Sequence, residues 1–156
     1  MSGTNNDISF SKEIAANTSI ARFTIPIENM KLWDLEHPFL YEVKASDSGE
    51  NIDDELSTYF GMRKISAVEI PGKEFQYVAL NNNPIYMKLA LDQSYHPEGF
   101  YTFPSDQFMK EEIQRAKDLG LNGLRIHIKA EIPRKLYWAD KLGLLIQEDI
   151  PNFWGE

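Results

Sequence analysis

The chain has 156 residues and a mass of 18.0 kDa, a length that is typical of one domain. Its net charge of −8 provides no basic field to attract duplex nucleic acid or anionic membranes, so we expect neither as a partner. The absence of cysteine excludes disulfides, thiolate metal sites and a cysteine nucleophile. No apolar run approaches the ~18 residues of a membrane span. Met1–Asn6 lacks the features of a signal peptide, and the compartment stays unknown.

Residues up to about 80 have the character of a β domain. Several short segments alternate apolar and polar residues, which favours strands. The turn residues Asn81–Pro84 predict a hairpin between the last two of them, and short strands separated by turns are typical of a β-sandwich. The expected strands are Ile20–Ile27, Leu40–Ala45, Arg63–Ile70, Phe75–Leu80 and Ile85–Leu91.

An acidic segment, Asp47–Glu55, interrupts these strands. Runs of like charge usually face water, so we interpret it as a solvated hairpin loop. A calcium site is the alternative, although the spacing differs from that of an EF-hand loop.

The second half of the chain predicts a βαβαβ arrangement. Helical periodicity indicates helices over 105–119 and 133–142, with strands at Leu121–Ile128 and Leu144–Ile146. Strands that alternate with helices favour a parallel sheet with right-handed crossovers. The residues suited to start or end these helices are Ser105, Gly120, Pro133 and Gly143.

The strand predicted over Leu121–Ile128 carries the candidate chemistry. Alternation places Leu124, Ile126 and Ile128 on one face and Arg125 and His127 on the other. In a barrel the polar pair would face the lumen near the carboxyl end of the strand, where active sites form. The alternative is structural: Arg125 pairs with a nearby carboxylate and His127 makes a structural hydrogen bond.

Six segments, in order along the chain, resemble glycoside hydrolase family 2, which contains β-galactosidases, β-glucuronidases and β-mannosidases. Each motif is weak alone, but the order and number of the motifs make the resemblance strong. The segments are Leu32–Tyr41 ("W…P.LY"), Phe60–Arg63 ("FGfR"), Asn81–Pro84 ("lNgkP"), Leu91–Gly99 ("LDQGYWPEG"), Leu119–Arg125 ("lGfNavR") and Leu136–Leu145 ("fyd.cDelGllv").

The resemblance implies a mixed β and α/β fold. Residues 1–80 would form a partial immunoglobulin-like β-sandwich, and residues 81–156 would form the first βαβαβ part of a (β/α)₈ barrel. A complete sandwich takes ~100 residues and a barrel takes ~250. We therefore expect an internal fragment of a larger enzyme.

The resemblance also implies an activity, the hydrolysis of β-glycosidic O-linkages with retention. Retaining enzymes use two carboxyl groups ~5–5.5 Å apart, which in this family come from later barrel strands. We therefore expect no catalytic residue in this chain and no activity from it alone. The alternative is a non-catalytic fragment that binds carbohydrate or oligomerises.

Substrate contacts are implied for a small set of residues. Arg125 matches the active-site arginine of the family, His127 lies where the family has Ser-His, and Asp149 lies where it usually has Glu. Trp154 follows the third strand and could stack on a sugar ring. The expected substrate-binding residues are Arg125, His127, Asp92, Asp149 and Trp154.

We assign no metal ligand and no cofactor to this chain, and a magnesium ion remains an option for the parent enzyme. The expected partner is a carbohydrate, a β-glycoside. Because three strands cannot close a barrel, their unpaired edges favour association. We therefore expect a homo-oligomer, with residues 85–92 or 144–154 in the contact.

Overall fold

The computed structural model describes residues 8–15, 18–49 and 52–151. They form a mixed β and α fold, rich in short strands, in agreement with the predicted fold class at that level. Contacts divide the chain into two compact units, residues 1–30 and 31–156. The elements are β1 (Tyr41–Gly49), β2 (Ile52–Phe60), β3 (Ile65–Glu69), β4 (Gln76–Leu80), β5 (Asn83–Pro84), β6 (Leu89–Asp92), α1 (Asp106–Asp118), β7 (Gly123–Ile126), α2 (Pro133–Leu142) and β8 (Leu145–Glu148).

The first unit contains neither helix nor strand in its described residues. The strand predicted over Ile20–Ile27 was therefore wrong. No described segment pairs with it, its apolar side chains are largely exposed, and Pro26 has no N–H to donate to a ladder. Alternation alone does not make a strand, because a strand also requires a neighbour.

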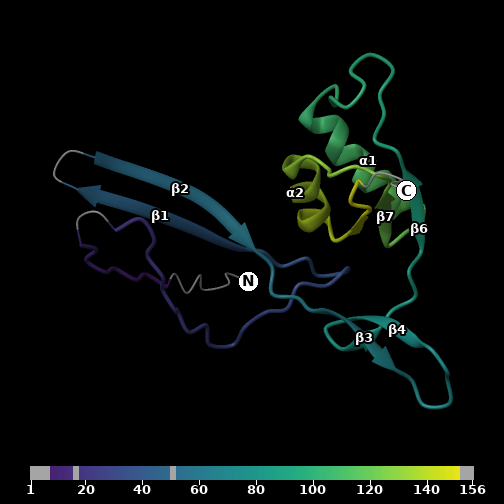
Figure 1. Ribbon diagram of the computed structural model, residues 1–156, viewed down its shortest axis with the longest axis horizontal. Helices are drawn as coiled ribbons and strands as arrows, with labels where there is room; N and C mark the ends of the chain where they lie inside the picture. The colour runs from purple at the N-terminus through teal and green to yellow at the C-terminus, as the bar shows by residue number, and fades with distance from the viewer. Residues whose placement is uncertain (1–7, 16–17, 50–51, 152–156) are drawn as a thin grey trace, which may run out of the picture. The chain divides into compact units, whose positions relative to one another are not determined.

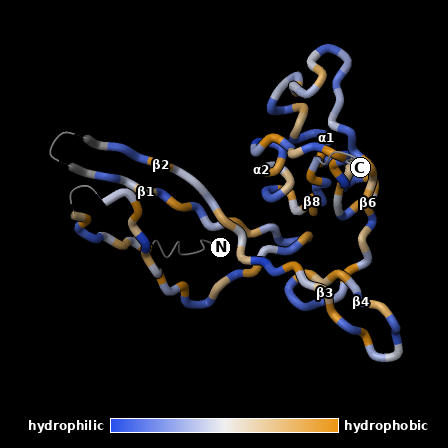
Figure 2. Tube along the Cα trace, in the orientation of Figure 1, coloured by the Kyte–Doolittle hydropathy of each residue, from blue (hydrophilic) through white to orange (hydrophobic). Residues whose placement is uncertain are grey.

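Strands β1 and β2 pair antiparallel over nine residues each. The acidic segment was predicted as a loop, but Asp47 and Asp54 lie within the strands as register partners. Figure 2 shows the hydrophilic colouring of the described part of the hairpin next to its tip. Both carboxylates are exposed, so water weakens their repulsion to about 1 kcal/mol and the backbone ladder continues through them.

Strands β3, β4 and β5 form a second antiparallel sheet. The strands predicted over Arg63–Ile70 and Phe75–Leu80 are confirmed as β3 and β4. The hairpin predicted between Phe75–Leu80 and Ile85–Leu91 is only partly correct, because β4 pairs with Asn83–Pro84 alone. The following residues instead enter a different sheet as β6.

The order β6–β7–β8 is a parallel sheet, with α1 and α2 as its crossovers (Figure 1). Both predicted helices are confirmed, and so are their ends. The Ser105 hydroxyl accepts a hydrogen bond from the Phe108 N–H at 3.1 Å, and Pro133 opens α2. Gly120 and Gly143 both adopt the left-handed conformation, with φ of 79°, where glycine is favoured.

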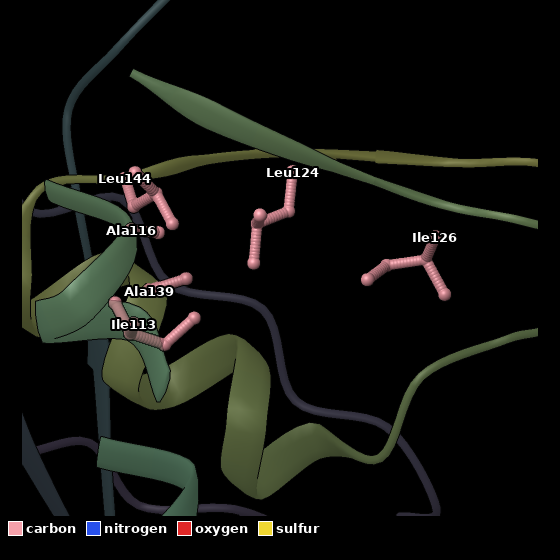
Figure 3. Close-up of a cluster of buried hydrophobic side chains, with 6 residues drawn as sticks. All are labelled: Ile113, Ala116, Leu124, Ile126, Ala139 and Leu144. Atoms are coloured by element: carbon pink, nitrogen blue, oxygen red, sulfur yellow. The ribbon is translucent and has the colours of Figure 1, made fainter. Parts of the chain in front are cut away.

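One face of this sheet packs on the two helices. Figure 3 shows Leu124 and Ile126 of β7 directed toward Ile113 of α1 and Ala139 of α2. The predicted alternation is confirmed for these two strand residues, but Ile128 does not continue it. Ile128 lies beyond β7 with φ of 51° and is 47% exposed, because the chain has already turned out of the sheet.

Within residues 8–15, 18–49 and 52–151, the opposite face of the sheet is covered at its amino end. There Leu145 packs with Trp33 and Leu80 in a second buried cluster. Gly123 leaves room for these contacts, since a Cβ on it would lie 2.6 Å from Leu89 Cδ2 and 2.8 Å from the Leu145 carbonyl oxygen. Nearer the carboxyl end, Leu91, Arg125 and Gln147 share one level of the register and are exposed.

Candidate functional site

Arg125 and Asp149 form an ion pair at the carboxyl edge of the parallel sheet. The guanidinium Nη2 lies 2.7 Å from Asp149 Oδ2, and Nε donates to Oδ1 at 3.3 Å. The Asp149 N–H donates to the Ile126 carbonyl at 2.9 Å, which holds the aspartate beside β7. Arg125 stays 46% exposed, so the structural pairing leaves the guanidinium accessible to a ligand.

His127 follows β7 and contacts the end of β6. Its backbone N–H donates to the Asp92 carbonyl at 3.1 Å. Its ring Nδ1 lies 3.1 Å from the Gln93 side-chain amide. The histidine therefore makes the structural hydrogen bond that the sequence offered as one alternative, and this bond lies at the same edge as Arg125.

Lys135 is a completely buried lysine beneath this edge. Its ammonium lies 2.6 Å from Asp92 Oδ2, 3.2 Å from Glu112 Oε2 and 3.6 Å from Glu131 Oε2. It also donates to Ser94 Oγ at 3.1 Å. One cation therefore joins α1, α2, the end of β6 and the loop that follows β7.

Sequence reasoning missed Lys135, although a signal was present. Lys135 precedes Ala139 by four residues, and these two are the buried residues of α2. A lysine at an apolar position of a helical pattern indicates a buried cation when carboxylates are near enough to compensate it.

The charges of this cluster stabilise one another. Burial by itself lowers the pKa of Lys135, but the hydrogen bond to Asp92 and the neighbouring carboxylates outweigh it, so the pKa lies above its ordinary value. Burial likewise raises the pKa of Glu131, but the hydrogen bonds from Ser94 and the Ile132 N–H, with the charge of Lys135, hold it below its ordinary value. Both groups are therefore ionised at neutral pH.

Ser94 connects this cluster to the loop after β6. It is buried and has φ of 51°. Its N–H donates to Asp92 Oδ1 at 2.7 Å, and its hydroxyl donates to Glu131. A strained backbone position of this kind persists only where the surroundings determine it strongly, and here the buried charges do so.

Four of the five predicted binding residues thus gather at one edge: Asp92, Arg125, His127 and Asp149. Trp154 lies outside the described residues. The part of the chain that the structure describes contains no group of three or more His, Asp or Glu side chains placed to hold a metal ion. Among the same residues, no helix has the length and apolar character to cross a membrane.

The comparisons with known proteins agree on one class. Residues 2–63 match the family model "Glycosyl hydrolases family 2". A β-galactosidase of Thermoanaerobacterium thermosulfurigenes is 30% identical over 138 residues, which is 84% of this chain and 18% of that protein. A putative β-glucuronidase of Formosa agariphila is 28% identical over 141 residues, 89% of this chain and 16% of that protein.

Solved structures of the same class share the fold. The β-glucuronidase of Parabacteroides merdae matches with a TM-score of 0.70 and 24% identity, over 80% of this chain and 15% of that one. The β-glucuronidase 3 of Bacteroides uniformis matches with a TM-score of 0.66 and 25% identity, over 78% and 15%. The matching proteins are glycosidases. These matches place residues 2–63 in glycoside hydrolase family 2, and the chain spans less than a fifth of the length of these curated relatives.

Proposed function

We propose that this chain is an internal part of a retaining β-glycosidase. In this proposal residues 1–80 belong to an immunoglobulin-like sandwich and residues 81–156 begin a (β/α)₈ barrel. The parallel order β6–β7–β8 with its helical crossovers supports the barrel assignment. The similarity to enzymes named β-galactosidase and putative β-glucuronidase supports a β-glycoside as substrate.

The observation that carries this proposal is the Arg125–Asp149 ion pair at the carboxyl edge of the sheet. Barrel enzymes build their active sites at this edge. An accessible guanidinium offers several N–H donors to sugar hydroxyl or carboxylate oxygens. Asp92, His127 and Trp154 are proposed to complete this side of the sugar pocket.

We assign the acid/base and the nucleophile to other parts of the enzyme. Each carboxylate described at this edge already has a partner. Asp149 is paired with Arg125, Asp92 with Lys135, and Glu131 with Lys129 at 3.1 Å. Glu148 accepts the Glu131 N–H at 2.7 Å. A catalytic acid requires a raised pKa, whereas the pKa of Glu131 is lowered.

The 156-residue chain should therefore not hydrolyse aryl β-galactosides or aryl β-glucuronides. In this proposal the physical reason is that the carboxyl pair, which this chemistry requires, comes from other parts of the enzyme. Release of the aryl group, followed by absorbance, measures it. Turnover that is abolished by Glu148→Gln or Asp149→Asn would show that the catalytic groups lie in this chain and would overturn our assignment.

In an enzyme that includes this chain, Arg125→Ala should lower kcat/KM for an aryl β-glycoside by about 100-fold, as expected for a lost charge-assisted contact. Arg115→Ala is the matched control, because Arg115 is an exposed arginine of α1 that pairs with Glu111. Steady-state kinetics of both variants provide the comparison. Equal kcat/KM values for the two variants would remove Arg125 from the pocket.

A further inference from the structure

Three exposed aromatic side chains gather on the loop that follows β6. Tyr95, Phe100 and Tyr101, which we call the aromatic trio, are 57%, 66% and 54% exposed. The ring centroids of Tyr95 and Tyr101 are 4.8 Å apart, and those of Tyr95 and Phe100 are 6.5 Å apart. Aromatic rings normally contribute to burial, and a contiguous exposed group of them marks a binding surface.

The loop presents these rings from a fixed backbone. His96 and Phe100 exchange two backbone hydrogen bonds, at 2.8 and 2.9 Å. The His96 ring is buried and lies 4.5 Å from the Phe103 ring between centroids. Phe100 has φ of 52°, an unfavourable value for a bulky residue. A tight, strained turn with a buried base holds the exposed rings in place before any ligand arrives.

The trio lies at the edge that carries the candidate site. Gln93, which contacts His127, immediately precedes the loop. Lys129 donates to the Ser94 carbonyl at 3.4 Å, and its ammonium lies 5.1 Å from the Tyr101 ring centroid. The loop is thus joined on one side to the buried charges and on the other to the residues after β7.

We propose that the aromatic trio is a binding surface for a pyranose unit of a β-linked saccharide. The apolar C–H face of a pyranose stacks on an aromatic ring, while the tyrosine hydroxyls and Lys129 supply hydrogen-bonding groups at its rim. This inference rests on the proposed function for the choice of ligand. It assigns to the loop a role separate from that of Arg125 and from the catalytic carboxyl pair.

Titration of the 156-residue chain with lactose, followed by NMR, tests the surface directly. We expect the resonances of Tyr95, Phe100 and Tyr101 to shift with a single dissociation constant in the millimolar range, as for a small open site. The variant Tyr95→Ala/Tyr101→Ala should weaken this binding by about tenfold or more. The control is Tyr86→Ala, because Tyr86 is 79% exposed and lies before the opposite, amino end of β6.

The outcomes are distinct. Unshifted trio resonances at about 100 mM lactose, which is far above a millimolar dissociation constant, would overturn the proposal. Equal weakening by Tyr86→Ala would also overturn it. A self-association that sedimentation detects and the double variant abolishes would assign the trio to a contact between copies instead. If a longer enzyme that includes this chain hydrolyses β-glycosides but the aromatic trio does not bind lactose, only this inference is refuted. If the aromatic trio binds lactose but the longer enzyme does not hydrolyse β-glycosides, only the proposed function is refuted.

Discussion

Replacing Lys135 with methionine should lower the free energy of unfolding by about 3–5 kcal/mol, which is the cost of removing one partner from a buried charge pair. The ammonium is completely buried and is shared by Asp92, Glu112 and Glu131. Methionine fills similar space but leaves these carboxylates without their cation. Urea denaturation measures the loss. Lys73→Met, at an exposed lysine between β3 and β4, is the matched control and should change stability by less than about 0.5 kcal/mol.

The pH dependence of this variant provides a second readout. In the wild-type chain the pKa of Glu131 is lowered, so its stabilisation is present above the unfolded-state pKa and is lost as pH falls through the folded-state value. Without Lys135 that pKa should rise, and protonation of Glu131 should then relieve the variant. We expect the deficit to shrink as pH falls from neutral to about 4, near the ordinary pKa of a glutamate. A constant deficit over this range, or one no larger than that of Lys73→Met, would contradict the role of Lys135.

Trp33→Ala should destabilise the chain by about 3–5 kcal/mol, as for other buried aromatic residues. Trp33 is completely buried and packs on Leu80 and Leu145. Its indole N–H donates to the Asp140 carbonyl at 2.7 Å, and the Arg63 guanidinium lies 4.4 Å from its ring centroid. The substitution removes all of these contacts and leaves a cavity at the amino end of the parallel sheet.

Trp138→Ala is the matched control for this experiment. Trp138 is only partly buried, and its indole N–H donates at 2.9 Å to the exposed carboxylate of Asp106. We expect a loss of about 1 kcal/mol, the centre of the range for single substitutions, because Trp138 packs against the main core cluster without being fully buried in it. Thermal or urea unfolding of both variants gives the comparison. A Trp33 variant that is as stable as the Trp138 variant would mean that the cluster of Trp33, Leu80 and Leu145 contributes little to the fold.

The elements that sequence predicted correctly are those whose signals are local. Ser105 accepts its hydrogen bond from a residue three positions away. Gly143 ends α2 because the left-handed backbone suits glycine at that one position. The alternation of Leu124 and Ile126 follows from the two-residue repeat of a strand. None of these features depends on a residue far away in the sequence. A short stretch of sequence is therefore enough to predict each of them.

The candidate edge was predicted in part for a similar reason. Arg125 and His127 were expected near the carboxyl end of one strand, and Asp92 and Asp149 were expected from the family resemblance. The structure brings these four residues to one edge, because parallel strands end at the same side of the sheet. The role of each in binding a sugar stays a prediction.

Tertiary structure decided the features whose cause lies in remote residues. Ile20–Ile27 has the pattern of a strand, but no described segment pairs with it. Ile85–Leu91 was predicted as a hairpin arm, but Leu89–Asp92 pairs with β7 in a parallel sheet, because main-chain groups bind the neighbour that the topology provides. Burial of Lys135 is favourable only because carboxylates from α1, β6 and the loop after β7 meet around it. Lys135 and Asp92 are 43 residues apart in the sequence, and no local pattern encodes a contact over that separation.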